Sequence, residues 1–270
     1  MTRADGYLDF LLRRDGEADV MRRTLSRREV FFTALAADPV RSSRPVDRAS
    51  YARNVARRRP ERGLAAETLW LVATAKANQA ERFGVGLADL YGRVHAESDP
   101  VRVHIQLQEF YHTRILADAV SVFGLSVRPL PPAAAARLIV QLIVRTPEAW
   151  HLPLTGCAEM VGCVVFRALR DLAGELFGEE PRVAARLRLL YDEILADEIG
   201  HVGFIASLLP AWKRAVMRGL YRRLGPRLVA QFPELIALAG PAELRRRLAA
   251  FSLPAMVAEL PGIAYAAATP

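Results

Sequence analysis

The sequence predicts an all-α protein built around four long helices. Ala, Leu, Arg and Glu, which favour helix, dominate the chain, and apolar residues recur at spacings of three and four instead of alternating as they do in strands. The 270 residues are 52% hydrophobic and 24% charged, which suits a large core and excludes a disordered chain. The two cysteines, Cys157 and Cys163, exclude a disulfide scaffold and a cysteine-based zinc module.

Start and stop signals place the long helices along the chain. Ser98-Asp99-Pro100 is a helix-start signal before the second helix, and Gly124 ends that helix. Pro181 begins the fourth helix, and Pro210 interrupts it. The four helices are expected at residues 65–94, 101–123, 153–177 and 181–209.

The four helices form two hairpins joined by a long connection, residues 125–150, in which a helical piece is expected at 133–144. Two hairpins with a long crossover are a common plan for a four-helix bundle. This plan predicts an N-terminal helical extension at 1–64, a bundle at 65–209 and a C-terminal helical extension at 210–270 that packs on the bundle.

The formal net charge of +8 lies in the two flanks. Residues 1–65 and 213–270 each carry +6, whereas residues 66–212 carry −4. Nearly all the basic residues are arginines, and their clusters lack the interleaved aromatic residues of a nucleic-acid surface. We therefore expect a solvated basic surface, with an anionic partner such as a carboxylate, a phosphopantetheine carrier or RNA as the alternative; a nucleic-acid partner is not favoured.

The first residues and the hydropathy pattern indicate a cytoplasmic protein without a membrane span. The start, MTRADGYLDF, carries acids and lacks the apolar stretch of a signal peptide. No charge-free run approaches the roughly 18 residues needed to cross a bilayer.

Two Glu-x-x-His motifs carry the chemistry of the sequence. They are Glu109 to His112 in the second long helix and Glu198 to His201 in the fourth. A spacing of three on a helix points both side chains of a motif to one face. Carboxylate oxygens and imidazole nitrogens together suit iron or manganese.

The other two helices offer one glutamate each at the matching height. Glu159 is a lone carboxylate in the apolar stretch LTGCAEMVGCVVF, where burial is costly unless a cation neutralises it. With turns near residues 96 and 179, Glu81 lies level with Glu109 to within roughly 3 Å, and Glu159 lies level with Glu198. Glu67 would be displaced by roughly 24 Å and is excluded.

These residues resemble the ligands of the ferritin-like carboxylate-bridged di-iron proteins, in which one Glu from each of two helices joins a Glu-x-x-His from each of two others. The resemblance covers residues 65–207 and is a match of motifs, not of overall sequence. It implies a ferritin-like four-helix bundle with two iron ions that activate O2, while manganese or a mixed manganese–iron pair stays open. The implied metal ligands are Glu81, Glu109, His112, Glu159, Glu198 and His201.

The resemblance also implies neighbours that orient the ligands. Asp197, directly before Glu198, is similar to an acid that orients a ligand imidazole, here that of His112. Gln108 precedes Glu109 where several hydroxylases carry a second Asp, so the other histidine is expected to be supported differently.

Four more residues are expected near the centre. Asn78, one turn before the ligand of the first helix, is expected to support the ligands from behind. Thr155 and Cys163 lie one turn on either side of Glu159 and are expected, with Tyr111, to line a substrate pocket. Packing as a small apolar residue is the alternative for Cys163.

Within this family the chain resembles the oxygenases and oxidases more than the ferritins, because it carries about 120 residues outside 65–212, which a compact storage protein does not need. Leu116 stands where radical-generating reductase subunits carry a tyrosine, although Tyr111 and Tyr191 keep that alternative open. The Cys-x-x-Cys pairs of rubrerythrins are absent from the sequence. Ile194 stands where arylamine N-oxygenases carry a seventh ligand, which favours six ligands.

The resemblance therefore implies an O2-dependent enzyme that hydroxylates, N-oxygenates or desaturates a small organic or carrier-bound substrate, in a biosynthetic pathway. Its electrons would come from an external ferredoxin or reductase, because the sequence shows no flavin, nicotinamide or iron–sulfur module. The alternatives are a ferroxidase or di-manganese protein, and a non-catalytic helical binding protein. A homodimer stays open.

Overall fold

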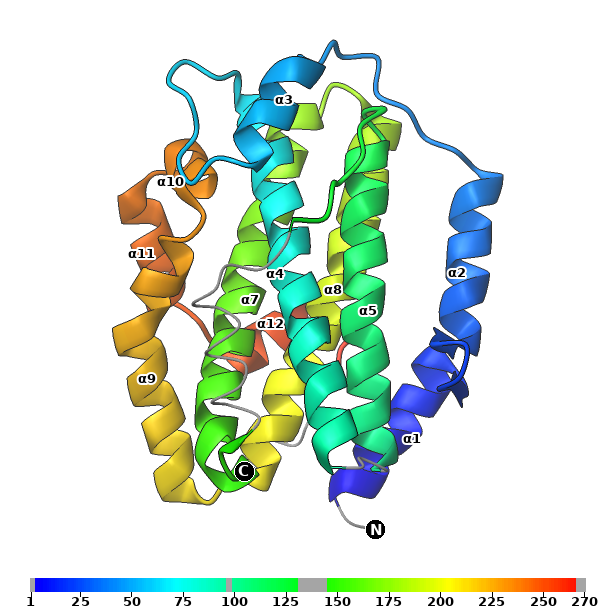
Figure 1. Ribbon diagram of the computed structural model, residues 1–270, viewed down its shortest axis with the longest axis vertical. Coiled ribbons are helices and arrows are strands. Elements are labelled where there is room, and N and C mark those ends of the chain that lie inside the picture. The colour runs from blue at the N-terminus through cyan, green and yellow to red at the C-terminus, as the bar shows by residue number, and fades with distance from the viewer. Residues whose placement is uncertain (1–2, 96–98, 131–144, 266–270) are drawn as a thin grey trace.

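The computed structural model describes residues 3–95, 99–130 and 145–265, which form eleven helices and one very short β-hairpin (Figure 1). The fold is all-α, as the sequence predicts. Its four long helices are α4 (Ala66–His95), α5 (Pro100–Ser121), α7 (Glu148–Phe177) and α8 (Pro181–Leu208). The helical piece predicted at 133–144 lies outside the described residues.

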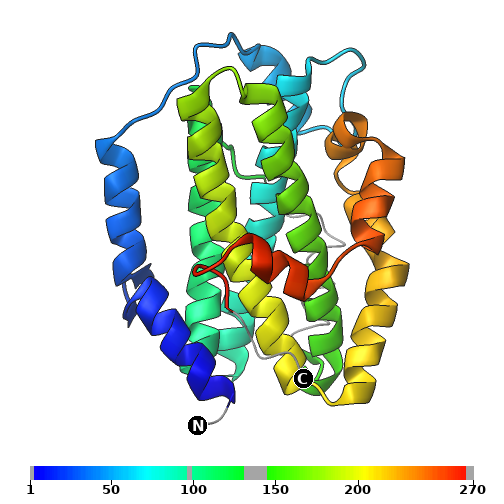
Figure 2. The same cartoon turned by 180° about the vertical axis from the view of Figure 1, so that it is seen from behind.

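The four long helices pack as two pairs that lie side by side. α4 packs along α5, and α7 packs along α8, while α5 also touches α8 and α4 touches α7. Neighbouring helices run in opposite directions (Figures 1 and 2). Side chains at the middle of all four helices therefore face a common interior.

Capping explains where α5 begins. The Asp99 carboxylate accepts a hydrogen bond from the Val101 N–H at 2.9 Å, and Pro100 occupies the first turn, where its missing N–H costs nothing. This start fixes the register of α5 and, with it, the height of Glu109 in the bundle.

The third long helix begins earlier than the sequence predicts. α7 starts at Glu148, five residues before Pro153, so that the proline lies inside the helix. Its missing N–H removes one helical hydrogen bond near the helix end, where the loss is tolerated. One turn later the Thr155 hydroxyl donates to the His151 carbonyl at 3.3 Å.

The N-terminal region wraps against α5 and α8. α1 packs on both of these helices, and the hairpin packs on α5. The hairpin was not predicted, because paired strands of two residues are too short to show an alternating pattern. The elements are α1 (Arg3–Asp15), β1 (Ala18–Asp19), β2 (Thr24–Leu25), α2 (Ser26–Ala37) and α3 (Arg48–Val55).

Four C-terminal helices cover the opposite side (Figure 2). α9 packs on α7, α10 on α4, α11 on α9 and α12 on α8. A proline stands at or next to the start of each, as the sequence suggests. Their bounds are α9 (Ala211–Val229), α10 (Pro233–Ala239), α11 (Pro241–Ala249) and α12 (Leu253–Glu259).

The end of the bundle at the α7–α8 turn is filled by an aromatic core. Trp70 is fully buried, and its indole N–H donates to the Leu169 carbonyl at 2.8 Å. Its ring lies edge-on to Phe177 with 5.2 Å between centroids. The hydroxyls of Thr74 and Tyr191 are hydrogen-bonded at 2.8 Å, so these buried polar groups and the Trp70 indole find partners inside the protein.

One described helix, Trp150–Phe177, is long and apolar enough to cross a membrane by length and composition. Of its most apolar window, 61% is buried inside the protein, where the helix packs against α4, α8 and α9. A core helix has the same properties, and the packing accounts for the hydropathy of this one.

Candidate metal centre

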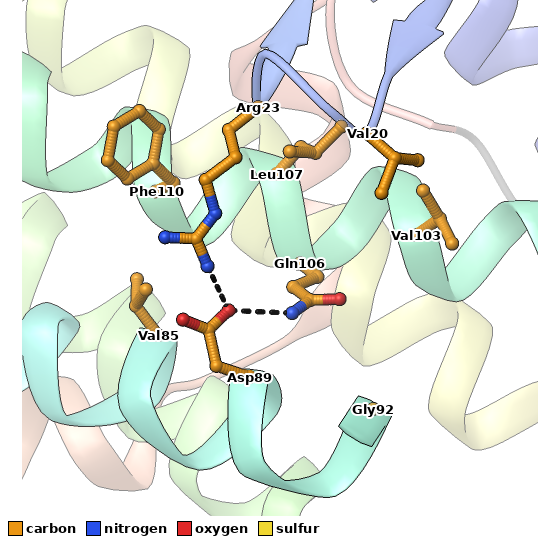
Figure 3. Close-up of a pocket in the computed structure, with 9 residues that line it drawn as sticks. All are labelled: Val20, Arg23, Val85, Asp89, Gly92, Val103, Gln106, Leu107 and Phe110. Atoms are coloured by element: carbon orange, nitrogen blue, oxygen red, sulfur yellow. Dashed lines mark hydrogen bonds and ion pairs between the residues drawn. The ribbon is translucent and has the colours of Figure 1, made fainter. Parts of the chain in front are cut away.

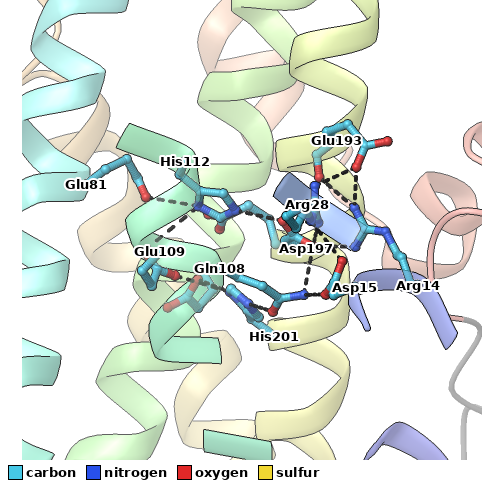
Figure 4. A network of polar contacts seen from close by, with 12 residues as sticks. Arg14, Asp15, Arg28, Glu81, Gln108, Glu109, His112, Glu193, Asp197 and His201 are labelled. Atoms are coloured by element: carbon cyan, nitrogen blue, oxygen red, sulfur yellow. Dashed lines mark hydrogen bonds and ion pairs between the residues drawn. The ribbon is translucent and has the colours of Figure 1, made fainter. Parts of the chain in front are cut away.

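The six glutamate and histidine side chains predicted as ligands lie together between the four long helices. Figure 4 labels four of them, Glu81, Glu109, His112 and His201. They form two overlapping groups, and within each group the potential ligand atoms all lie within 4.8 Å of one another. Glu109 and Glu198 belong to both groups. The first group adds Glu81 and His112, and the second adds Glu159 and His201.

Each of the four long helices contributes one or two of the potential ligands. α4 and α7 supply one carboxylate each, whereas α5 and α8 supply a carboxylate and an imidazole three residues apart on one face. The predicted heights of the glutamates agree with the structure. Glu81 lies beside the α5 motif, and Glu159 lies beside the α8 motif.

Both imidazole rings turn the same nitrogen toward the carboxylates. His112 Nδ1 lies 3.1 Å from Glu81 Oε2 and 3.5 Å from Glu198 Oε1. His201 Nδ1 lies 3.3 Å from Glu109 Oε1 and 3.4 Å from Glu159 Oε2. Nδ1 is therefore the nitrogen of each ring that would face a bound cation.

The second nitrogen of each ring is hydrogen-bonded behind the centre. His112 Nε2 lies 3.1 Å from Asp197 Oδ2, which is the partner that the resemblance implies. His201 Nε2 lies 2.9 Å from Gln108 Oε1, so Gln108 supplies the different support that was expected. Orientation of a ligand histidine through its other ring nitrogen is a general feature of metal sites.

Burial and mutual charge set the protonation of these groups. Burial beside Glu109 raises the pKa of Glu81 to about 8, and burial among the other glutamates raises the pKa of Glu198 well above its usual range. Burial would also raise the pKa of Glu109, but the hydrogen bond from His201 and the two imidazole charges outweigh it and lower this pKa to about 2.

Burial would lower the pKa of both imidazoles, but the surrounding carboxylates prevail. They raise the pKa of His112 to about 10 and the pKa of His201 to about 9. Protons therefore balance the buried carboxylates, and divalent cations are the other species that can take this role.

Gly162 makes room for a carboxylate that both groups share. A Cβ at this position of α7 would lie 2.7 Å from Glu198 Oε2, closer than real Cβ atoms approach. Gly162 was not among the predicted site residues. The sequence does offer a clue to its role. Gly162 lies inside an apolar helix three residues after Glu159, at a position where alanine would stabilise the helix more than glycine does.

The N-terminal helices bring charged residues that the sequence did not single out. Arg14 at the end of α1 and Arg28 in α2 pair with Asp197 and Glu193 of α8 behind the histidines, and Asp15 of α1 pairs with Arg28 (Figure 4). The basic N-terminal region was expected to be a solvated surface. Arg28 contradicts this, because it is only 3% exposed.

Asn78 does not support the ligands as predicted. Its amide nitrogen donates to the Thr113 carbonyl of α5, and its oxygen accepts from Arg82 Nε at 2.9 Å. Asn78 therefore ties α4 to α5 one turn away from Glu81.

The Tyr111 side chain faces away from the centre. Tyr111 is two residues from Glu109, about 200° around the helix, and cannot share its face. Its hydroxyl donates to Glu29 and accepts from the Leu25 N–H, so it attaches α2 and the hairpin to α5.

A cavity of about 290 Å³ lies between α4, α5 and the β1–β2 turn (Figure 3). Arg23 at its edge is paired with Asp89, which also accepts from Gln106 at 2.8 Å. Thr155, Cys163 and Tyr111 are not among the residues that line this cavity, so the predicted pocket residues stay a prediction here. Its apolar wall consists of Val20, Val85, Val103, Leu107 and Phe110.

Cys163 is fully buried, and burial together with the nearby Glu159 carboxylate raises the pKa of its thiol. A thiol held protonated beside carboxylates is a weak metal ligand. Cys163 therefore packs as a small apolar side chain.

Comparison with protein-family models, with curated proteins and with solved structures finds no match for this chain. The fold and the site therefore define it only as a mostly helical protein whose buried glutamate and histidine clusters can hold metal.

Proposed function

We propose that the chain is a non-haem di-iron oxygenase or oxidase with a ferritin-like bundle. The observation that carries the proposal is the sharing of Glu109 and Glu198 by two adjacent ligand groups. Separate sites would not need shared carboxylates, whereas a pair of ions held close together is bridged by them.

Six residues would hold the pair. Glu81 and His112 would hold one ion, Glu159 and His201 would hold the other, and Glu109 and Glu198 could contribute to both. The four carboxylates neutralise two divalent cations, so the loaded site fits an interior of low polarity. When bound, the iron pair supplies the electrons that activate O2 for oxidation of an organic substrate.

The chain's own residues orient the ligands and exclude water. Asp197 and Gln108 fix the two imidazoles from behind, and all four of these side chains are at most 1% exposed. The cavity beside α4 and α5 is close in volume to a small-molecule pocket, and we propose that a small organic substrate enters there. A separate redox protein is the proposed electron donor.

Metal content after anaerobic loading with ferrous iron tests the assignment. The full chain is expected to retain two irons per chain after desalting. Glu198→Ala is expected to retain fewer than one, because this residue reaches both groups, whereas Glu159→Ala keeps about one, because it reaches only the second.

The matched control is Glu175→Ala, an exposed glutamate on the same helix as Glu159, which should retain both irons. Two irons in Glu198→Ala would contradict the ligand assignment. Uptake of O2 with growth of a ferric mineral would indicate iron storage, and stable retention of manganese but not iron would indicate a di-manganese protein.

A further inference from the structure

Two arginines from the N-terminal helices lie against the back of the candidate centre. Arg28 Nη2 contacts both oxygens of Asp197, at 2.7 and 2.8 Å, and Arg14 pairs with Asp197 Oδ1. The Asp197 side chain is fully buried, and those of Arg14 and Arg28 are 12% and 3% exposed. Water therefore screens these charges little, and their effect on the neighbouring histidine is strong.

Arg28 is held in place by three acids. Its Nε donates to Asp15 Oδ1 at 2.8 Å, its Nη1 donates to Glu193 Oε2 at 2.6 Å, and its Nη2 binds Asp197. A planar guanidinium can make such bonds in fixed directions, whereas a lysine cannot. The position of Asp197 is thereby fixed from a segment more than 150 residues away in the sequence.

Gln108 carries the same network to the second histidine. Its amide nitrogen donates to Asp15 Oδ2 at 2.6 Å and to Asp197 Oδ1 at 2.9 Å. Ionised carboxylates only accept, so the amide cannot flip, and its oxygen must face His201 Nε2. That Nε2 therefore carries a hydrogen, which leaves the Nδ1 of His201 for a metal.

Close packing of α1 on α8 holds Arg14 and Asp15 in these positions. Gly200, inside the Glu-x-x-His motif of α8, has no side chain, and a Cβ there would lie 2.6 Å from the Tyr7 hydroxyl of α1. Tyr7 itself is 1% exposed and packs on Phe204 with ring centroids 5.3 Å apart. The N-terminal helix is therefore packed directly on the ligand motif.

We propose that Arg28, assisted by Arg14, is a positioning residue that sets the metal affinity and the reduction potential of the centre through Asp197 and Gln108. This inference rests on the proposed di-metal function. The two arginines and the three acids leave one net negative charge behind the histidines. Loss of Arg28 makes this charge more negative and removes the partner that orients Asp197.

Replacement of Arg28 by glutamine should therefore change two measurable properties. Iron affinity should fall about 10- to 100-fold, as expected when a partner that orients a ligand is removed. The midpoint potential should shift downward, because the loss of a nearby positive charge favours the more positively charged ferric ions. Arg28→Lys keeps the charge and should restore most of the potential but not the affinity.

The experiment compares iron affinity, by competition with a chelator, and midpoint potential in the full chain. Arg182→Gln is the control, because this arginine lies on α8 like Asp197 but its side chain is 72% exposed and pairs with an exposed aspartate. Unchanged affinity and potential in Arg28→Gln would overturn the inference and leave the di-metal proposal intact. A wild-type chain that binds no metal would overturn both.

A second variant keeps the test decisive where Arg28→Gln does not fold. Asp15→Asn retains the size of the side chain but releases both Arg28 and the Gln108 amide. It should weaken iron binding at the second group, which contains His201, while circular dichroism stays unchanged. A folded Asp15→Asn variant with wild-type affinity and potential would overturn the inference.

Discussion

Glu109 and Glu198 each reach both ligand groups, so the positions of single carboxylate oxygens decide what the centre can hold. Their positions depend on residues that carry no charge. Gly162 leaves the space that Glu198 occupies, and any side chain there would push the carboxylate out of the shared position. The absence of a side chain at Gly162 is therefore part of what places the Glu198 carboxylate.

Gly162→Ala should weaken metal binding at least tenfold while the helix content is retained, because the added methyl group displaces Glu198. Gly174→Ala on the same helix is the control, since a Cβ there meets nothing within 4 Å. It should leave metal binding unchanged and raise the unfolding free energy by about 0.5–1 kcal/mol. Isothermal calorimetry with Mn²⁺ measures the affinities, and equal affinities in both variants would refute the steric argument.

Metal binding should release protons, because cations and protons compete for the same groups. At pH 7 the pKa values of about 8 for Glu81, 10 for His112 and 9 for His201 keep all three protonated. The affinity for Mn²⁺ should therefore rise as the pH increases from 6 to 8. Calorimetry in buffers of different ionisation enthalpy counts the protons, and a binding enthalpy independent of the buffer would show that none is released.

At the level of helices, the two hairpins set the heights of the ligands. α5 must begin at Pro100 for Glu109 to lie level with Glu81, and the Asp99 cap fixes this start. α7 tolerates Pro153 near its start because the lost hydrogen bond lies far from Glu159. α1 and α2 supply Arg14 and Arg28, which pair with Asp197 of α8. These two short helices therefore contribute side chains to the surroundings of the candidate centre.

Asp99→Ala should lower the unfolding free energy by about 1 kcal/mol, because the Val101 N–H loses its acceptor. Asp99→Asn keeps an oxygen at this position and should cost much less. Urea denaturation of both variants measures the difference. Equal losses in the two variants would show that charge, and not the capping bond, stabilises this helix end.

At the level of the whole molecule, the sequence could predict the features that depend on the local helical repeat. The helical period is visible in any stretch of a dozen residues, and it places both members of each Glu-x-x-His motif on one face. Equal distances from the hairpin turn then select Glu81 over Glu67, and the lone carboxylate of an apolar helix selects Glu159. The all-α fold and the meeting of the six side chains were predictable for this reason.

Contacts between segments that are far apart in the sequence produce no periodic pattern from which they could be predicted. Arg28 and Asp197 are 169 residues apart in the sequence, and Arg14 and Asp197 are 183 apart, so no spacing connects them. Composition pointed to a solvated basic flank, whereas Arg28 and Asp15 are buried in the folded chain. Tyr111 was misassigned because its closeness to Glu109 in sequence was not weighed against its angle around the helix.

Anomalous diffraction from crystals of the full chain grown with Fe²⁺ or Mn²⁺ tests the di-metal centre most directly. Two peaks are expected inside the bundle, about 3.5–4 Å apart. One should lie beside Glu81 and His112 and the other beside Glu159 and His201, with Glu109 and Glu198 touching both. Metal bound only outside these residues, or no metal in the bundle at full loading, would contradict the di-metal centre.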